Sequence, residues 1–148
     1  MSFCRLATAH DLPALLALEA LFPGDRLSRR SFVAMLRRPN ARIWVVEDAA
    51  GRVMADLVCL SRRDSPWWRI YSVVVHPEAR GKGYARCLMA AATDAARQAH
   101  AAGLRLEVRE DNAAARALYA SLGFTLRRRR LGYYDDGAAA VQLQRAAS

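Results

Sequence analysis

The sequence predicts an α/β fold in which one mixed sheet carries helices on its faces. Short apolar runs rich in β-branched residues alternate with longer segments whose apolar residues recur at helical spacing. The 148 residues are enough for one domain, and 53% hydrophobic with 25% charged residues is typical of a packed globular protein. We therefore expect residues 1–148 to form a single domain with the element order β-α-α-β-β-β-α-β-α-β-β.

Helix caps and breakers set the limits of the elements in the first half of the chain. Asp11 before Pro13 is typical of a helix start, and Ser28 can cap a second helix that ends before Pro39. The expected elements are a strand at residues 3–8, helices at 11–22 and 28–38, and strands at 43–46 and 53–60.

The second half is expected to alternate strands and helices up to a final pair of strands. Pro66-Trp67-Trp68 precedes the central strand, and Gly103 is a good residue for the end of the long helix. In the strand after it, Leu104, Leu106 and Val108 share one face. The expected elements are strands at 70–75, 104–109, 124–131 and 138–143, and helices from about 83 to 102 and from 112 to 122.

The stretch from Ile70 to Arg86 has the layout of a phosphate cradle. An apolar strand ends at His76-Pro77, and two glycines then precede the long helix. A helix N-terminus leaves about four backbone N–H groups unpaired and carries about half a positive charge. Gly81 and Gly83 remove side chains that would keep a pyrophosphate away from these groups. Fixed positive charge comes from three neighbours, Arg80, Lys82 and Arg86.

Two common phosphate-binding motifs do not fit this loop. It lacks the Gly-Lys-Ser/Thr of a P-loop, and Arg86 stands where a dinucleotide fingerprint needs its third glycine. The pattern Arg-x-x-Gly-x-Ala from Arg80 to Ala85, directly after an apolar strand, instead resembles the acetyl-CoA signature of the GNAT acetyltransferase superfamily. This resemblance implies the GNAT fold, a mostly antiparallel mixed sheet of about seven strands flanked by four helices.

A second group of motifs resembles the RimI-type branch of this superfamily, the protein N-terminal acetyltransferases. That branch carries Leu-Glu-Val-Arg, then Asn-x-x-Ala, then Leu-Tyr-x-x-Leu-Gly-Phe, and later a Tyr-Tyr pair. The same motifs stand here at 106–109, 112–115, 118–124 and 133–134, so the resemblance covers about residues 68–136. Residues 24–28 depart from the branch, which usually has Trp-Ser after Phe-Pro, so the resemblance does not decide whether the substrate is a ribosomal protein.

The resemblance implies direct transfer of acetyl from acetyl-CoA to a primary amine, without a metal. It assigns Glu107 as the general base and Tyr119 as the general acid. Acetyl-CoA is expected to bind along Val73, Val74, Val75, Arg80, Gly81, Lys82, Gly83, Tyr84, Ala85, Arg86 and Asn112. The acceptor is expected to lie against Phe22, Asp25, Tyr133 and Tyr134.

The chemistry of the reaction suits these assignments. An α-amine has a pKa of about 8, so much of it is protonated and non-nucleophilic at neutral pH. A carboxylate can remove that proton directly or through water, and a phenol can protonate the departing thiolate. Backbone N–H groups near Val75 can polarise the thioester carbonyl. No covalent enzyme intermediate is needed, so the reaction does not require a cysteine nucleophile.

Simpler interpretations of the same residues stay open. Glu107 lies between Arg105 and Arg109 and can be a surface ion-pair partner. Tyr119 can serve only as a packed ring, and Asn112 is a plausible helix cap. Residues 127–130 are four successive arginines, which should alternate between the faces of a strand, with two at most on any one face. They can act as a charged edge strand or as a site for an acidic partner.

Three functions compete at this stage. The motifs favour acetylation of a protein or peptide N-terminus, and the alternative is acetylation of a small amine such as a polyamine, amino acid or antibiotic. The net charge of +9 attracts polyanions, so a third hypothesis is a basic RNA- or ribosome-binding module with a vestigial fold. The intact loop and the pair Glu107 and Tyr119 argue against it, so a nucleic-acid partner is not expected. We expect no membrane contact, because no apolar run approaches the roughly 18 residues of a membrane-spanning helix. The N-terminal residues lack the apolar region of a signal peptide, so a cytoplasmic location is expected. The protein is expected to be a monomer or a homodimer.

Overall fold

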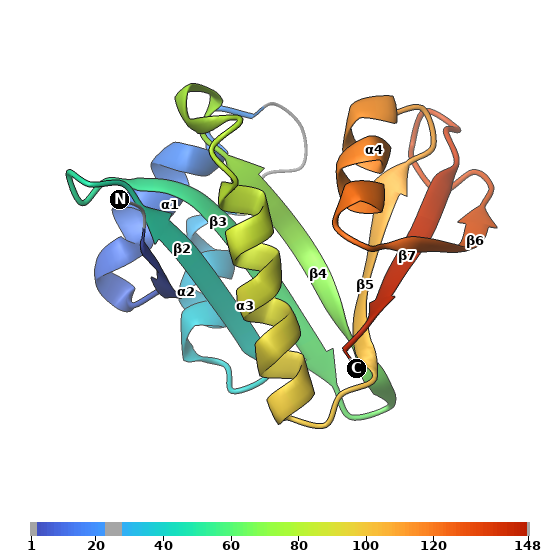
Figure 1. Ribbon diagram of the computed structural model, residues 1–148, viewed down its shortest axis with the longest axis horizontal. Helices are drawn as coiled ribbons and strands as arrows, with labels where there is room; N and C mark the ends of the chain where they lie inside the picture. Colours follow the sequence, from blue (N-terminus) through green and yellow to red (C-terminus); the bar gives the residue numbers. More distant parts are fainter. Residues whose placement is uncertain (1–2, 23–27, 148) are drawn as a thin grey trace.

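The computed structural model describes residues 3–22 and 28–147. They form one seven-stranded sheet with helices on both faces (Figure 1). The predicted element order is confirmed. The elements are β1 (Phe3–Leu6), α1 (Leu12–Glu19), α2 (Arg29–Arg37), β2 (Ala41–Glu47), β3 (Val53–Arg62), β4 (Ser65–Val75), α3 (Tyr84–Gln98), β5 (Gly103–Arg109), α4 (Ala113–Ser121), β6 (Thr125–Arg130) and β7 (Ala140–Ala146). None of the described helices is long and apolar enough to cross a membrane.

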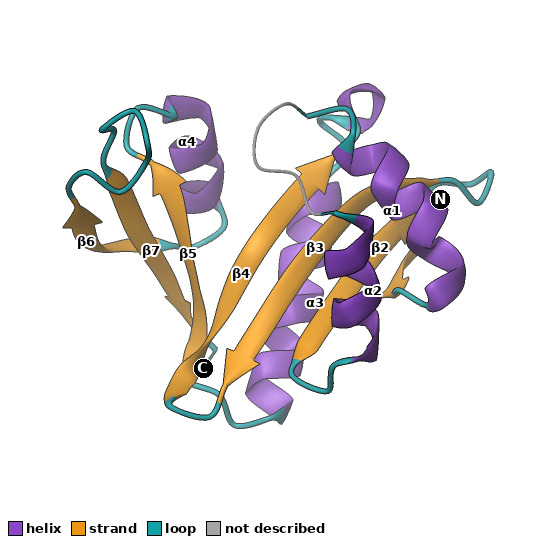
Figure 2. Cartoon of the chain, turned by 180° about the vertical axis from the view of Figure 1, so that it is seen from behind, coloured by secondary structure: helices purple, strands orange, loops and turns teal. Residues whose placement is uncertain are grey.

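The sheet is divided by a gap between two neighbouring strands, β4 and β5. The strand order is β1-β2-β3-β4-β5-β7-β6, and every pair is antiparallel except β4–β5. Those two strands pair only where Trp67–Arg69 meets Gly103–Arg105, and they then diverge (Figures 1 and 2). The predicted mixed, mostly antiparallel sheet of seven strands with four helices is therefore confirmed. The divergence leaves the far half of β4 without a strand on its β5 side among the described residues.

The helices cover the two faces unevenly. On one face, α3 lies over the centre of the sheet, and α4 packs on the same side against β5 (Figure 1). On the other face, α1 and α2 lie over β2 and β3, while no described helix covers β5, β7 and β6 (Figure 2). One face of the second half of the sheet is therefore open.

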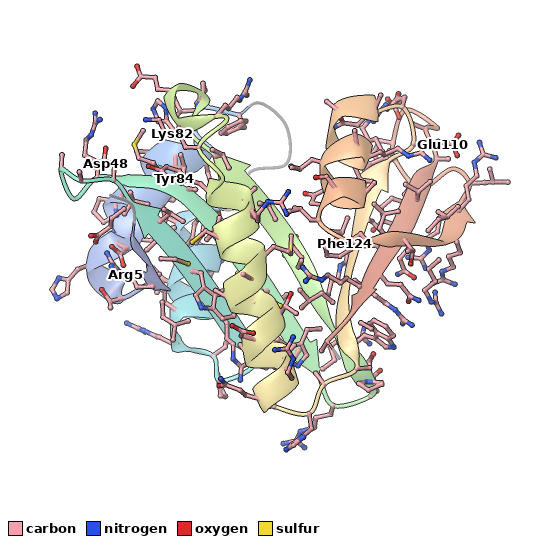
Figure 3. The ribbon with its side chains drawn as sticks, in the orientation of Figure 1. Arg5, Asp48, Lys82, Tyr84, Glu110 and Phe124 are labelled. Atoms are coloured by element: carbon pink, nitrogen blue, oxygen red, sulfur yellow. The ribbon has the colours of Figure 1, made fainter. Side chains whose placement is uncertain are left out.

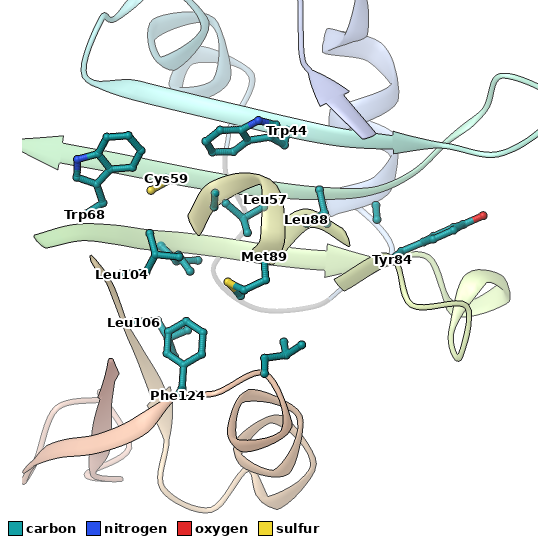
Figure 4. Packing of buried hydrophobic residues seen from close by; sticks show 14 of the residues in the cluster. Trp44, Leu57, Cys59, Trp68, Tyr84, Leu88, Met89, Leu104, Leu106 and Phe124 are labelled. Carbon is teal, nitrogen blue, oxygen red and sulfur yellow. The ribbon is translucent and has the colours of Figure 1, made fainter. Parts of the chain in front are cut away.

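The larger core lies under α3 and joins the two halves of the sheet. Leu88 and Met89 of α3 pack between Leu57 of β3 and Leu104 of β5, and Phe124 extends the cluster to the region of α4 (Figure 4). All five side chains are at most 5% exposed. Burying a side chain of this size stabilises a fold by about 1.5–3 kcal/mol. This packing holds the halves together where β4 and β5 no longer pair.

Strand β4 starts earlier than predicted and contains a bulge. The sequence placed Pro66-Trp67-Trp68 before the strand, but β4 begins at Ser65, and Trp68 is buried in the core. Pro66 is tolerated near the strand end, where its missing N–H is not needed. The register steps from Cys59↔Ile70 to Val58↔Ser72, so Tyr71 is an extra residue. The bulge turns Ser72 toward α1, where its hydroxyl donates to Glu19.

The end of the long helix was predicted wrongly. Helix α3 stops at Gln98, and the left-handed residue after it is His100, with φ 59°, rather than Gly103. The N–H of Ala101 then bonds the carbonyl of Ala96 at 2.9 Å and closes the helix end. Gly103 instead begins β5 at a close approach of strands. A Cβ there would stand 2.2 Å from the carbonyl oxygen of Arg145, so only glycine fits.

A second bulge changes the expected distribution of the four arginines in β6. Leu126 faces Leu143 and Arg128 faces Gln142, so Arg127 is an extra residue. Arg127 and Arg130 reach the face of Gln142 and Glu107, whereas Arg129 pairs with Glu110 on the α4 side. Three arginines, rather than two at most, therefore share one face, since Arg128 lies opposite Gln142.

Smaller differences concern element ends. Strand β1 stops at Leu6 rather than at residue 8, α1 stops at Glu19 rather than at residue 22, and β7 runs from Ala140 to Ala146 rather than over 138–143. After Glu19 the chain makes tight turns, in which Phe22 N–H bonds the Glu19 carbonyl at 3.1 Å. Such fraying at helix ends is common.

Candidate active site

The loop between β4 and α3 has the conformation that a phosphate cradle requires. Gly81 and Gly83 have φ of +81° and +78°, a left-handed region that favours glycine. Gly83 is the N-cap of α3, a helix of 15 residues. Directly after it, Tyr84 is 7% exposed and packs into the core, which fixes the start of the helix. The free N–H groups of this helix end consequently have a fixed direction.

A groove of about 610 Å³ runs between this loop and α4. One wall comes from the end of β4 and the cradle, and the other from Ala115, Leu118 and Tyr119 of α4. Phe22 also lines it. The residues expected at the cofactor that line the groove are Val73, Val74, Val75, Arg80, Gly81, Gly83, Tyr84, Ala85 and Arg86. The structure thus brings together most of the residues named from the local motif.

Two residues expected at the cofactor do not line the groove. Lys82 is exposed beside Tyr84 at the N-terminal end of α3 (Figure 3). Asn112 caps α4, where its Oδ1 accepts the N–H of Ala115 at 3.0 Å. The capping role of Asn112 is observed, and its contact with a cofactor stays a prediction.

Tyr119 lines the groove from α4 with a largely buried ring. The ring packs edge-on against Phe124, with centroids 5.8 Å apart and an interplanar angle of 65°. Burial raises the pKa of its phenol above the ordinary value of 10.0. The phenol therefore keeps its proton at neutral pH, as a general acid must. Packing and proton donation are compatible roles for this side chain.

Glu107 lies on β5 and points to the face opposite the groove. Its side chain is 7% exposed, and Arg69 forms an ion pair with Oε2 at 2.8 Å, without the alignment of a hydrogen bond. Gln142 donates to Oε1 at 3.1 Å, and Arg130 approaches it at 3.4 Å. Glu107 is therefore an ion-pair partner, but of Arg69 and Arg130 rather than its sequence neighbours. Its role as base stays a prediction.

The loop with the two tyrosines lies beside this carboxylate. Tyr133 and Tyr134 contact each other edge-to-face with centroids 5.0 Å apart. Arg69 donates to the Tyr133 hydroxyl at 3.3 Å, and the Arg130 guanidinium lies 5.5 Å from the centre of its ring. The same two arginines thus contact both Glu107 and Tyr133. Asp25 lies outside the described residues.

Sequence reasoning missed Arg69 and Gln142, the residues that hold Glu107. Both reach it through strand pairing, since Arg69 lies across from Arg105 in the parallel register and Gln142 lies opposite Glu107 itself. The sequence pattern around Glu107 indicates neither its contact with Arg69 nor its contact with Gln142. Both contacts depend on the register of strands that are distant in the sequence.

A buried acid on β3 was also missed. Asp56 is fully buried, and neither of its carboxyl oxygens has a hydrogen-bond partner among the described residues. Burial, and next the nearby charge of Glu19, raise the pKa of Asp56 well above its usual value. Asp56 is the one charged residue in the apolar run of β3, and this departure from the pattern is the signal that could have indicated a buried acid.

Comparisons with known proteins agree with this geometry. A family model described as "Acetyltransferase (GNAT) family" matches residues 10–124. The mycothiol acetyltransferase of Beutenbergia cavernae is 35% identical over 83 residues, which are 56% of this chain and 28% of that protein. The chain thus spans less than a third of that relative.

Solved structures agree over nearly the whole chain. The ribosomal-protein-S18-alanine N-acetyltransferase from Escherichia coli superposes with a TM-score of 0.87 and 26% identity, covering 100% of this chain and 95% of that one. An acetyltransferase of Bacillus anthracis str. Ames, solved in complex with acetyl coenzyme A, has a TM-score of 0.81 and 16% identity over 99% and 98% of the two chains. The match to the family model over most of the chain, together with the gap between β4 and β5 and the glycine cradle, shows that this chain belongs to the GNAT family of acetyltransferases.

Proposed function

We propose that this protein acetylates the N-terminal α-amine of a protein or peptide, with acetyl-CoA in the groove and the acceptor on the opposite face. The observation that carries the proposal is the arrangement around the gap between β4 and β5. The cradle and Tyr119 lie on one side of the gap, and Glu107 with Tyr133 lies on the other. The two reactants would meet through the opening.

The residues of the groove suit acetyl-CoA, the co-substrate of GNAT enzymes. Added Cβ atoms at Gly81 and Gly83 would meet nothing within 4 Å, so the space above the cradle is free for a pyrophosphate. Beyond Arg69, the edge of β4 that faces the gap has no strand partner among the described residues. Its backbone groups at Val73, Val74 and Val75 can therefore pair with the amides of pantetheine.

The chain's own groups divide the proton transfers between them. When bound, acetyl-CoA supplies an activated acyl group with a thiolate as leaving group. In the proposed reaction, Glu107 accepts the proton of the acceptor amine, and the protonated Tyr119 donates one to the leaving thiolate. The core under α3 holds β5 and α4 in fixed positions on either side of the gap.

A small polycationic acceptor fits the structure less well. Arg69 and Arg130 flank Glu107, and both lie where a cationic acceptor would approach. They would repel the second and third charges of a polyamine. A small uncharged or anionic amine remains the second candidate, in line with the partial match to a mycothiol acetyltransferase.

The test is release of free CoA from acetyl-CoA by the purified protein with two sets of acceptors. One set is peptides with free N-termini, each matched to the same peptide with a blocked N-terminus. The other set is polyamines, amino acids and amino sugars. The proposal expects turnover only with free peptide N-termini. Turnover with blocked peptides or only with small amines would contradict it.

A further inference from the structure

The open face of β5, β7 and β6, together with the adjoining end of β4, carries a group of five arginines, here called the arginine face: Arg69 of β4, Arg105 of β5, and Arg127, Arg128 and Arg130 of β6. No described helix covers this face (Figure 2). The bulge at Arg127 adds a third arginine from β6 to it. Arginines so close together repel one another, so their arrangement needs a physical reason.

Contacts between the members join the arginine face to Glu107. Arg69 and Arg130 pair with its carboxylate. Gln142 donates to the same carboxylate at 3.1 Å and accepts from Arg127 at 2.6 Å. The arginine face is therefore continuous with the place where we put the acceptor amine.

The described carboxylates do not neutralise this charge. Glu107 is shared by Arg69 and Arg130, and Arg128 has no ion pair or hydrogen bond among the described residues. Arg105 bonds only the neutral amide of Gln144, at 3.1 Å. Burial, and then the charges of Arg127 and Arg128, lower the pKa of Arg105 below its ordinary value. An anionic ligand would relieve this repulsion.

We propose that the arginine face binds carboxylates that follow the acceptor amine, so that the substrate is a peptide N-terminus with Asp or Glu among its first residues. This inference rests on the proposed function and narrows its substrate class. Guanidinium groups bind carboxylates in paired hydrogen bonds, and residues next to an amine held at Glu107 fall within reach of Arg130 and Arg127.

The dimensions and the aromatic residues favour an acidic peptide over a nucleic acid. Strands β5, β7 and β6 are about 4.8 Å apart, so the face is roughly 10 Å wide, the length of about three residues of extended chain. Trp67 and Tyr133 each hold a guanidinium, at 4.2 Å and 5.5 Å from the ring centres, rather than standing free to stack bases. A long phosphate backbone would find few further contacts here.

The first experiment compares three peptides with the same first residue and with Asp, Asn or Lys at positions 2–4. We expect kcat/KM for the Asp peptide to exceed that for the Asn peptide by about tenfold at low salt, with the Lys peptide lowest. The preference should fade toward 1 M salt, where the Debye length is about 3 Å. Equal values for the three peptides would overturn the inference but leave the proposed function intact. Failure of all three, with turnover of a small amine, would instead overturn the proposed function.

The second experiment compares Arg128→Gln with Arg52→Gln, which removes the same charge from the remote turn between β2 and β3. We expect Arg128→Gln to lower the Asp-to-Asn preference by about fivefold and Arg52→Gln to leave it unchanged. The same loss in both variants would assign the preference to net charge and overturn the inference. The inference would also be overturned if RNA competed with the Asp peptide for the parent protein but not for Arg128→Gln.

Discussion

The two sides of the gap between β4 and β5 are built from contacts of different range. On the side where we propose that acetyl-CoA binds, here called the cofactor side, the cradle consists of a few consecutive residues whose conformations follow from Gly81 and Gly83. On the side where we propose that the acceptor binds, here called the acceptor side, Glu107 is held by Arg69, Arg130 and Gln142, which come from three other strands. The cradle of the first side depends mainly on residues that are close together in the sequence. The second exists only once the sheet has its register.

Because of this difference, the acceptor side can change without a change on the cofactor side. The cofactor side needs only a strand end, two glycines and a helix, so it can stay the same while the rest of the domain changes. The acceptor side depends on bulges and strand register, and one extra residue such as Arg127 changes which charges face the acceptor. If the two sides act as separate units, a substitution on one side should leave ligand affinity on the other side unchanged.

The largest effect is expected from removing the phenol that faces the groove. Tyr119→Phe keeps the ring and its contact with Phe124 but removes the proton donor. We expect kcat to fall by about 100-fold or more, with little change in acetyl-CoA affinity. Turnover assays and calorimetry with acetyl-CoA measure the two quantities. The control is Tyr71→Phe, an exposed phenol on β4. Equal turnover of Tyr119→Phe and the parent protein would remove Tyr119 from the acid role.

The next effect isolates the cradle. Gly81→Ala forces a side chain into a left-handed conformation that costs about 1–2 kcal/mol, and the loop should relax away from its present shape. We expect about tenfold weaker acetyl-CoA binding in calorimetry. Gly137→Ala is a matched control, because Gly137 has φ 84° and open space around it but lies in the loop before β7. If both variants bind acetyl-CoA equally well, the cradle is not the phosphate site.

Much of the fold and the cofactor side followed from the sequence because their causes are local. Ser28 accepts the Ser31 N–H, and Asn112 accepts the Ala115 N–H, as helix caps do. The element order and the residues around the groove follow from such patterns. The functional roles of the groove residues stay predictions.

What the sequence did not predict depends on tertiary contacts. The bulges at Tyr71 and Arg127 appear only when the strands pair. Gly103 is needed because Arg145 and Trp67 close in on it, not because a helix ends there. Residues 127–130 were expected to alternate faces, which holds for a regular strand but not for a bulged one.

A smaller effect on activity is expected from the acceptor side. Arg69→Gln removes an ion pair to Glu107 at 2.8 Å and a hydrogen bond to Tyr133 at 3.3 Å. We expect the KM for the acceptor to rise by about fivefold while acetyl-CoA affinity is unchanged, because Arg69 faces away from the groove. The control is Arg62→Gln, which breaks only the exposed pair with Asp64. A parallel loss of acetyl-CoA affinity in Arg69→Gln would show that the two sides are coupled.

The smallest effect concerns stability rather than activity, and it comes from Asp56. Its pKa is raised in the folded protein by burial and then by Glu19, so the folded state keeps a proton that the unfolded state releases above about pH 4. Stability should therefore fall as pH rises from about 4 toward the folded pKa, by about 1.4 kcal/mol per pH unit at most. Asp56→Asn carries no such proton. The difference between its Tm and the Tm of the parent protein should therefore increase by about 3 °C per pH unit from pH 4 up to the folded pKa of Asp56.

Asp11 gives this prediction a control of opposite sign. Arg5 donates to its carboxylate at 2.8 Å, and this bond is the main reason that the pKa of Asp11 lies below its usual value. Its contribution to stability is present above about pH 4 and is lost only as pH falls through the lower folded pKa. Between pH 5 and pH 7, Asp11→Asn should therefore lower Tm by a constant amount, while the difference between Asp56→Asn and the parent protein changes with pH. Thermal unfolding followed by circular dichroism measures both series. Parallel curves for Asp56→Asn and the parent protein would mean that Asp56 titrates alike in the folded and unfolded states.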